Sequence, residues 1–269
     1  MKIISLNAYF GTCFDPLMEF IEHEAANTDI FCLQEMVSAE QNLKQVDDKG
    51  KRLNVLQEIV QRLPDHQLFF APMQSDFETN PTIYGHSEIG VAIFVKNNLL
   101  ITKNDYFFLC NNYNSFVPGD YSTIGFPTQW VQFNFDGQPL TICSVHGNSE
   151  PGHKLDTPER LLQSQKIIDF LKTQPGQKIV MGDFNLLPNT ESVQMFKPAG
   201  FRNLIEEYKI SSTRGTNNRK LHPEFGVGKY GFQEFADYTF VSPEIKVTEF
   251  TVPEVPVSDH LPMILKIEI

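Results

Sequence analysis

The amino-acid sequence predicts an α/β fold in which two packed sheets are flanked by layers of helices. Strand-like apolar runs alternate with segments of helical periodicity, the strands fall into two groups, and each group carries its own helices. A sheet that is apolar on one face buries it against another layer, which favours this arrangement. Residues 1–269 are expected to form one domain, because neither a linker-like stretch nor a repeat interrupts them.

The first group begins with a strand at residues 2–7, followed by a helix at residues 15–27. A short apolar strand at residues 29–34 ends in Glu35. A second helix is predicted over residues 53–63, where leucine and valine side chains recur at helical spacing.

The middle of the chain is rich in expected strands. They span residues 67–71, 90–96, 102–110, 128–135 and 140–146. Polar and apolar residues alternate over residues 131–136, which indicates a half-buried strand, and Asp136-Gly137 is a turn signal. The last two strands are therefore expected to form a hairpin.

The C-terminal part returns to helices and strands. A helix is predicted to start near Thr157, where a capping side chain, a proline and an acidic residue follow one another. It runs to about Lys172, because Pro175-Gly176 breaks it. The remaining elements are a strand at residues 178–181, a short helix after Asn189 and three closing strands at residues 236–242, 246–252 and 262–269.

The formal net charge of −11 argues against a protein that coats nucleic acid through a basic face. It does not exclude a nuclease, because a bound metal can supply positive charge locally. Acidic metal ligands also make the total charge more negative.

The four cysteines form no CxxC pair and are expected to be free thiols, which fits a reducing compartment. The N-terminus opens with a strand-like run and lacks the pattern of a signal peptide. No apolar run approaches the ~18 residues that would cross a membrane. We therefore expect a cytoplasmic protein without a transmembrane segment.

Polar side chains suited to metals or phosphates lie at the ends of several predicted strands. They belong to Asn7, to Gln34-Glu35, to Gly182-Asp183-Phe184-Asn185 and to Ser258-Asp259-His260. Each alone reads equally well as a turn or capping residue. Together they indicate an active site, because rigid strands hold such groups in place while loops approach the substrate.

The ordered set of these motifs resembles that of the endonuclease/exonuclease/phosphatase superfamily, which includes DNase I-like nucleases. The matching segments are Leu6-Asn7, Gln34-Glu35, Ser144-Val145-His146, Gly182-Asp183-Phe184-Asn185, Ala236-Asp237-Tyr238 and Ser258-Asp259-His260. The resemblance implies a four-layer α/β/β/α sandwich of two mixed sheets flanked by helices. It also implies hydrolysis of phosphodiesters or phosphomonoesters.

The resemblance places a metal ion at Glu35, with Asn7 and Asp259 beside it. Hard carboxylate and carbonyl oxygens suit Mg²⁺, which keeps several waters and bridges to phosphate. Mn²⁺ is the alternative ion.

The same resemblance assigns the catalytic roles. Asp183 would position and deprotonate the attacking water, and Asn185 would hold a phosphate oxygen. His260 would donate to the phosphoryl group, Asp237 would orient that ring, and His146 would contact the phosphate or the leaving group. These roles are physically coherent, because positive groups offset the charge that develops on the phosphoryl oxygens.

Three further residues are candidates for substrate binding. Arg214 can reach a phosphate oxygen with two donors. Glu88 can hydrogen-bond an active-site histidine, and Arg160 resembles a recurrent family position. For each, an ordinary surface role is the alternative.

Three stretches are expected to be long loops, at residues 72–88, 111–127 and 208–234. Loops of this length are usually functional or disordered. The third is locally basic, so it is either a solvated loop or a patch that meets an anionic substrate. Five aromatic residues form either a rim for a base or lipid or part of the core: Phe107, Phe108, Tyr113, Phe116 and Tyr121.

The sequence thus predicts a Mg²⁺-dependent phosphoester hydrolase, and a phosphodiesterase or nuclease is favoured. Its expected substrate is a nucleic acid or nucleotide, with a phospholipid as the alternative, and a monomer is expected. A phosphomonoesterase or a lipid phosphohydrolase acting on phosphoinositides or sphingomyelin is the second hypothesis. A non-catalytic binding module on the same fold is the third, although such a module would be expected to have lost one of the residues above.

Overall fold

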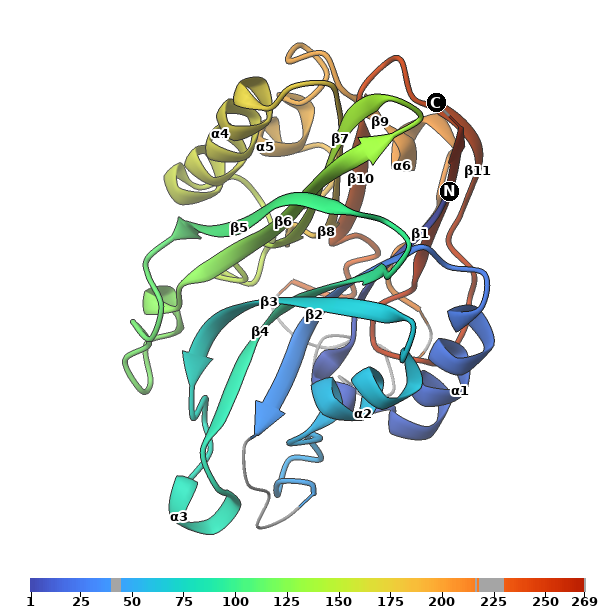
Figure 1. Ribbon diagram of the computed structural model, residues 1–269. Coiled ribbons are helices and arrows are strands. Elements are labelled where there is room, and N and C mark those ends of the chain that lie inside the picture. Colours follow the sequence, from blue (N-terminus) through green and yellow to red (C-terminus); the bar gives the residue numbers. More distant parts are fainter. Residues whose placement is uncertain (40–44, 216, 218–229, 269) are drawn as a thin grey trace.

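The computed structural model describes residues 1–39, 45–215, 217 and 230–268. Two six-stranded sheets pack face to face, and helices cover their outer faces (Figure 1). Each sheet contains both parallel and antiparallel neighbours. The predicted fold class, two mixed sheets flanked by helices, is confirmed.

The first sheet has the strand order β11-β12-β1-β2-β4-β3. Its strands are β1 (Lys2–Asn7), β2 (Ile30–Ala39), β3 (His66–Ser75), β4 (Ser87–Lys96), β11 (Lys246–Thr251) and β12 (Met263–Glu268). Only β1 and β2 are parallel, with Asn7 opposite Gln34. The carboxyl end of β1 therefore lies beside Glu35.

The second sheet has the order β5-β6-β7-β8-β10-β9. Its strands are β5 (Ile101–Cys110), β6 (Phe126–Phe135), β7 (Gln138–His146), β8 (Gln177–Asp183), β9 (Arg202–Asn203) and β10 (Asp237–Val241). The parallel pair β7 and β8 places His146 opposite Asp183, and the antiparallel pair β8 and β10 places Asp183 opposite Asp237. Three polar residues thus meet at one edge. The predicted hairpin between β6 and β7 is confirmed.

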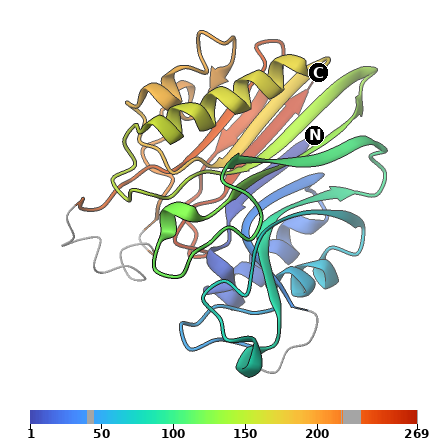
Figure 2. The same ribbon diagram turned by 90° about the vertical axis from the view of Figure 1, so that its left-hand side faces the viewer.

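The helices form the outer layers. Helices α1 (Phe14–Ala25) and α2 (Val55–Arg62) cover the first sheet, and α4 (Pro158–Thr173) and α5 (Glu191–Gln194) cover the second. Figure 2 shows α4 lying along the outer face of the second sheet. The short elements are α3 (Pro81–Tyr84), α6 (Leu204–Glu207) and the 3-10 turns η1 (Tyr9–Gly11) and η2 (Tyr121–Thr123). Within the described ranges, no helix is long and apolar enough to cross a membrane.

The hydrophobic core consists of two main clusters, and alternate side chains along a strand belong to different clusters. In β2, Ile30 and Cys32 belong to the cluster between the two sheets, whereas Phe31 and Leu33 pack in the cluster under α1 and α2. Successive strand residues point to opposite faces, so a strand buried on both sides is apolar throughout. This double burial holds β2 rigidly beneath the candidate site.

The structure corrects one strand boundary that matters for the site. The strand expected to end before Glu35 continues to Ala39, and its register with β4 shifts between Leu33 and Met36. Glu35 lies in this irregularity with φ 56°. An extra residue at a bulge leaves the apolar pattern on either side intact, so sequence periodicity gives no signal of it. Residues 216 and 218–229 of the basic loop expected at 208–234 lie outside the described residues.

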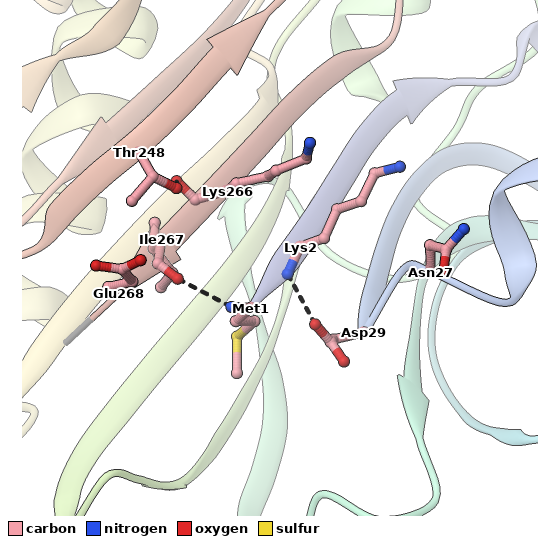
Figure 3. Close-up of a pocket in the computed structure, with 8 residues that line it drawn as sticks. All are labelled: Met1, Lys2, Asn27, Asp29, Thr248, Lys266, Ile267 and Glu268. Carbon is pink, nitrogen blue, oxygen red and sulfur yellow. Dashed lines mark hydrogen bonds between the residues drawn. The ribbon is translucent and has the colours of Figure 1, made fainter.

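The two chain ends lie side by side. The Met1 nitrogen donates to the Ile267 carbonyl at 2.9 Å, and the Ile267 nitrogen donates back to Met1 at 2.9 Å. A hollow of about 480 Å³ opens there (Figure 3). Its lysines, Lys2 and Lys266, each pair with a glutamate. This hollow lies at the amino end of β1, away from Asn7.

Candidate active site

Most of the predicted site residues meet in one pocket of about 600 Å³. Those that line it are Glu35, His146, Asp183, Asn185, Arg214, Asp259 and His260. They come from the strands and strand ends of both sheets, from the turn before β12 and, for Arg214, from the segment after α6. The pocket therefore forms where strand ends of the two sheets converge.

Asn7 connects the carboxylates of the two sheets. Its Nδ2 donates to Glu35 Oε1 at 3.0 Å and to Asp183 Oδ2 at 3.1 Å. Its Oδ1 accepts from the Tyr9 nitrogen at 3.0 Å, which fixes the orientation of the amide. In this arrangement Asn7 aligns both carboxylates, and its carbonyl faces the backbone.

Glu35, His146 and Asp183 form a group that fits a metal ion. One ligand atom from each lies within 4.8 Å of the others, and His146 Nε2 is 3.6 Å from Glu35 Oε1. Glu35 Oε2 is buried without a hydrogen-bond partner among the described residues. Burial raises the pKa of Glu35, and an unpaired buried carboxylate is costly. A divalent cation would remove both penalties, so the donor set fits one.

Asp237 holds His260 in place. His260 Nδ1 lies 2.8 Å and 3.0 Å from the two carboxylate oxygens of Asp237, and all these groups are buried. Burial and Arg214 lower the pKa of His260, but the carboxylates of Asp237, Asp259 and Asp183 outweigh them and raise it. His260 Nε2 faces Asp183 Oδ2 at 3.6 Å. The ring therefore links Asp237 to Asp183.

Arg214 reaches the same place from the segment after α6. Its Nη2 donates to Asp259 Oδ2 at 2.7 Å, and its Nη1 lies 2.9 Å from His260 Nε2. The Leu261 nitrogen donates to the Thr213 carbonyl at 2.8 Å, which places this segment beside the turn before β12. Arg214 Nε is buried without a partner among the described residues. One donor of the guanidinium thus remains for a ligand.

Asp183 is ready to act as a carboxylate. Burial opposes its ionisation, but His260, Lys154, His146 and Arg214 together lower its pKa. The Asn185 nitrogen donates to Asp183 Oδ1 at 2.8 Å. Asn185 has φ 54°, and its Nδ2 donates to the Gly147 carbonyl at 3.0 Å. One N–H of the Asn185 side-chain amide therefore donates within the protein, and the second N–H makes no hydrogen bond to a described residue.

Comparison with known proteins identifies the family. The model of the endonuclease/exonuclease/phosphatase family matches residues 4–260. The chain belongs to this family. No curated protein sequence matches the chain. Membership supports phosphoester hydrolysis and divalent-metal dependence at the level of the family.

Solved structures of family members share the fold. An endonuclease/exonuclease/phosphatase family protein from Leptotrichia buccalis is 20% identical over 100% of both chains, with a TM-score of 0.70. The mannosyl-6-phosphatase of Bacteroides thetaiotaomicron is 15% identical over 100% of both chains, with a TM-score of 0.67. D. rerio TDP2 in complex with a single-strand DNA product is 16% identical over 100% of this chain and 99% of that chain, with a TM-score of 0.64. These likenesses support the DNase I-like fold.

Within this family fold, two predicted substrate contacts lie elsewhere. Arg160 is fully buried in α4, and its guanidinium donates to the carbonyls of four residues. Those residues are Asn148, Ser149, Pro151 and Leu155. Glu88 accepts a hydrogen bond from the Tyr113 hydroxyl at 2.6 Å. Neither side chain lines the pocket.

Lys154 lines the pocket although sequence reasoning did not single it out. The residue is 8% exposed, in the segment between β7 and α4 that Arg160 ties down. Its ammonium makes no hydrogen bond or close ion pair to a described residue. Burial, with Arg214 next, lowers its pKa to about 8. A single lysine in a loop is normally expected to be exposed to solvent, so its burial could not be predicted from the sequence.

Proposed function

We propose that this chain is a divalent-metal-dependent phosphoester hydrolase, with phosphodiesters favoured, that uses water activated by Asp183. The observation that carries the proposal is that Asp183 belongs to two clusters. One contains Glu35 and His146, and the other contains Asp237 and His260. A proton acceptor is thereby held between a cation-binding carboxylate and a fixed imidazole.

The side chains divide the chemical work. The ionised Asp183 accepts the proton of a water molecule as that water attacks the phosphorus in line with the leaving oxygen. His260, oriented by Asp237, donates from Nε2 to the phosphoryl group once Arg214 turns toward the phosphate. Arg214 and Lys154 contribute positive charge where negative charge develops.

Glu35 would be the principal metal ligand, with Asp259 close enough to raise its pKa electrostatically. Oxygen donors suit Mg²⁺, and the nearby His146 imidazole makes Mn²⁺ acceptable as well. A bound cation would supply Lewis-acid withdrawal of charge from the phosphoryl oxygens. The orphaned Glu35 Oε2 supports this assignment.

The alternative is a phosphomonoesterase or a lipid phosphohydrolase. The neighbour named a mannosyl-6-phosphatase supports the phosphomonoesterase, whereas the neighbour bound to a single-strand DNA product supports the favoured phosphodiesterase. All of these hypotheses share the site that binds the phosphoryl group.

The test is an assay of the purified protein with Mg²⁺ or with EDTA. The substrates are single- and double-stranded DNA, RNA, dinucleotides, phosphoinositides, sphingomyelin and simple phosphomonoesters. Asp183→Asn is run beside Asp136→Asn, a matched change at an exposed hairpin turn. Metal-dependent turnover that is lost only in Asp183→Asn supports the proposal. Absence of both turnover and Mg²⁺ binding would make the binding module the leading hypothesis.

A further inference from the structure

The candidate active-site pocket is lined by apolar side chains as well as by its carboxylates. We call these apolar side chains the apolar wall, and it consists of Phe10, Met73, Phe77, Ile89, Ile124 and Phe126. The residues come from the turn after β1, from β3 and β4 with the connection between them, and from the start of β6. Three distant segments thus build one surface inside the same cavity.

The wall is held in a fixed shape. Met73, Ile89, Ile124 and Phe126 are all buried and form one cluster. A ligand would therefore meet a preformed surface, because the side chains that make it are already packed against each other.

Two rings complete the wall at its edge. The Lys51 ammonium lies 4.4 Å from the Phe10 ring centroid and 4.9 Å from that of Phe77. Phe77 also packs against Phe116 at 5.1 Å, and Phe116 packs against Tyr121 at 5.4 Å. Cation–π contacts restrain both rings from outside the pocket.

The backbone at Phe10 is strained. Its φ is 53°, a conformation that is unfavourable for a side chain of this size. Strain of this kind persists only where the surrounding structure imposes it. Here the strained turn directly follows Asn7. One short segment therefore carries both Asn7, which hydrogen-bonds the site carboxylates, and Phe10, which belongs to the wall.

The wall begins beside the polar groups. The Phe126 ring centroid is 5.1 Å from that of His146, which meets it edge-on. A phosphoryl group placed among Glu35, Asp183 and His260 would therefore direct its organic substituent along the wall.

The charged lining residues are distinct from those of the apolar wall. Among the lining residues that the structure describes, the acidic, basic and histidine side chains are Glu35, His146, Glu150, Lys154, Asp183, Arg214, Asp259 and His260. The apolar wall has none, so it offers nothing to the further phosphates that a polynucleotide carries. A volume of about 600 Å³ instead suits one small molecule.

We propose that the apolar wall binds an uncharged apolar group esterified to the phosphate, either an aromatic ring or a hydrocarbon chain. Small phosphoesters that carry one such group are then the preferred substrates. This inference rests on the proposed function for the position of the phosphoryl group.

Binding of n-alkylphosphonates to the Mg²⁺-loaded protein tests the wall without requiring turnover. Affinity measured by calorimetry from methyl- to octylphosphonate should rise about fourfold per methylene until the wall is filled. Phenylphosphonate and adenosine monophosphate form the aromatic arm, and glucose 6-phosphate is the polar comparison. Tighter binding of the aromatic or the alkyl arm identifies which apolar group is preferred.

Two results would overturn the inference: affinity that is independent of chain length, or glucose 6-phosphate binding as tightly as hexylphosphonate. Turnover is scored separately with the substrate panel. Hydrolysis without chain-length dependence leaves the proposed function intact and removes the apolar wall as a substrate site. Chain-length-dependent binding without hydrolysis of any substrate keeps the apolar wall as a binding site and contradicts the proposed function.

Variants localise the effect. Phe77→Ala should lower the ratio of hexyl- to methylphosphonate affinity about fivefold, and Phe77→Leu should restore most of it. Phe107→Ala is the matched control, because Phe107 packs on Phe170, with 4.8 Å between ring centroids, outside the pocket. Melting temperatures establish that each variant is folded. An unchanged ratio in folded Phe77→Ala contradicts the inference.

Discussion

Arg214 Nη1 lies 2.9 Å from His260 Nε2, while Nη2 of the same guanidinium lies 2.7 Å from Asp259 Oδ2. A guanidinium only donates hydrogen bonds, so Nε2 is an acceptor in this arrangement and the ring proton sits on Nδ1, facing Asp237. Once a phosphoryl group draws Arg214 away, the surrounding carboxylates favour protonation of Nε2. Arg214 therefore opposes protonation of His260, whereas the carboxylates of Asp237, Asp259 and Asp183 raise the pKa of the ring.

The first prediction concerns the fork of Arg214. Arg214→Lys should lower kcat/KM about 10- to 100-fold, because a single ammonium cannot contact both Asp259 and a phosphate with paired donors. Steady-state kinetics on the best substrate measure the effect. Arg202→Lys, at an exposed salt bridge with Glu207, is the control and should retain wild-type kinetics. Equal activity of the two variants would remove Arg214 from the site.

The second prediction concerns orientation of the imidazole. Asp237→Asn should lower kcat about 10²- to 10⁴-fold, because an amide no longer favours the Nδ1–H tautomer or the charged ring. KM should change far less, since Asp237 lies behind His260 and does not line the pocket. Separate determination of kcat and KM distinguishes this from lost binding. A kcat within threefold of wild type would show that His260 needs no orientation.

The polar residues of the site could be predicted from the sequence, because the end of a strand is a local feature of the sequence. Asn7 and Asp183 end strands that each have a parallel neighbour, and His260 precedes β12, whose antiparallel pairing with β1 brings its start to the carboxyl end of β1. The bulge at Glu35 could not be predicted, since one extra residue leaves the flanking apolar pattern unchanged. Lys154 was missed because its burial depends on α4, which lies farther along the chain.

The apolar wall illustrates a second limit of sequence reasoning. Its residues come from three segments that meet only through the packing of the two sheets, and each reads alone as a core residue. Of the five aromatic residues suggested as a rim, Tyr121 lines the pocket. Phe107 packs on Phe170 instead. Aromatic composition therefore suggested a surface without fixing which rings form it.

The third prediction tests the metal ligand. Glu35→Gln should weaken Mg²⁺ binding at least about tenfold, because a neutral amide replaces the carboxylate whose Oε2 is left unpaired. The affinity for Mg²⁺ is measured by calorimetry and from the Mg²⁺ concentration that gives half-maximal activity. Glu159→Gln, exposed at the start of α4, should leave both unchanged. Unaltered Mg²⁺ binding in Glu35→Gln would move the metal to other ligands.

The fourth prediction assigns Arg160 a structural role. Arg160→Met should lower stability by about 3 kcal/mol, or roughly 6–12 °C in Tm, because four backbone carbonyls lose a buried charged donor. Thermal unfolding measures the shift. Arg62→Met, at a partly exposed position of α2 where the guanidinium pairs with Glu22, is the control and should lower stability by no more than about 1 kcal/mol. A Tm equal to wild type would mean that water replaces the guanidinium.

The last prediction concerns Lys154 and pH. Its pKa is lowered to about 8, first by burial and then by Arg214, so the ammonium is charged below about pH 8 and neutral above it. If this cation binds the phosphate, kcat/KM falls as pH rises through about 8. Lys154→Arg stays charged throughout, so this upper limb should disappear from its profile.

Two further variants complete the test of Lys154. Lys154→Met lacks the cation at every pH, so its kcat/KM should be about 10- to 100-fold lower below pH 8 and should show no limb of this origin. Lys172→Arg, an exposed position in α4, should reproduce the wild-type profile. If wild type and Lys154→Arg share the same upper limb, another group sets it. Lys154 then contributes no charge to substrate binding, and its burial needs a structural explanation through the segment that Arg160 holds.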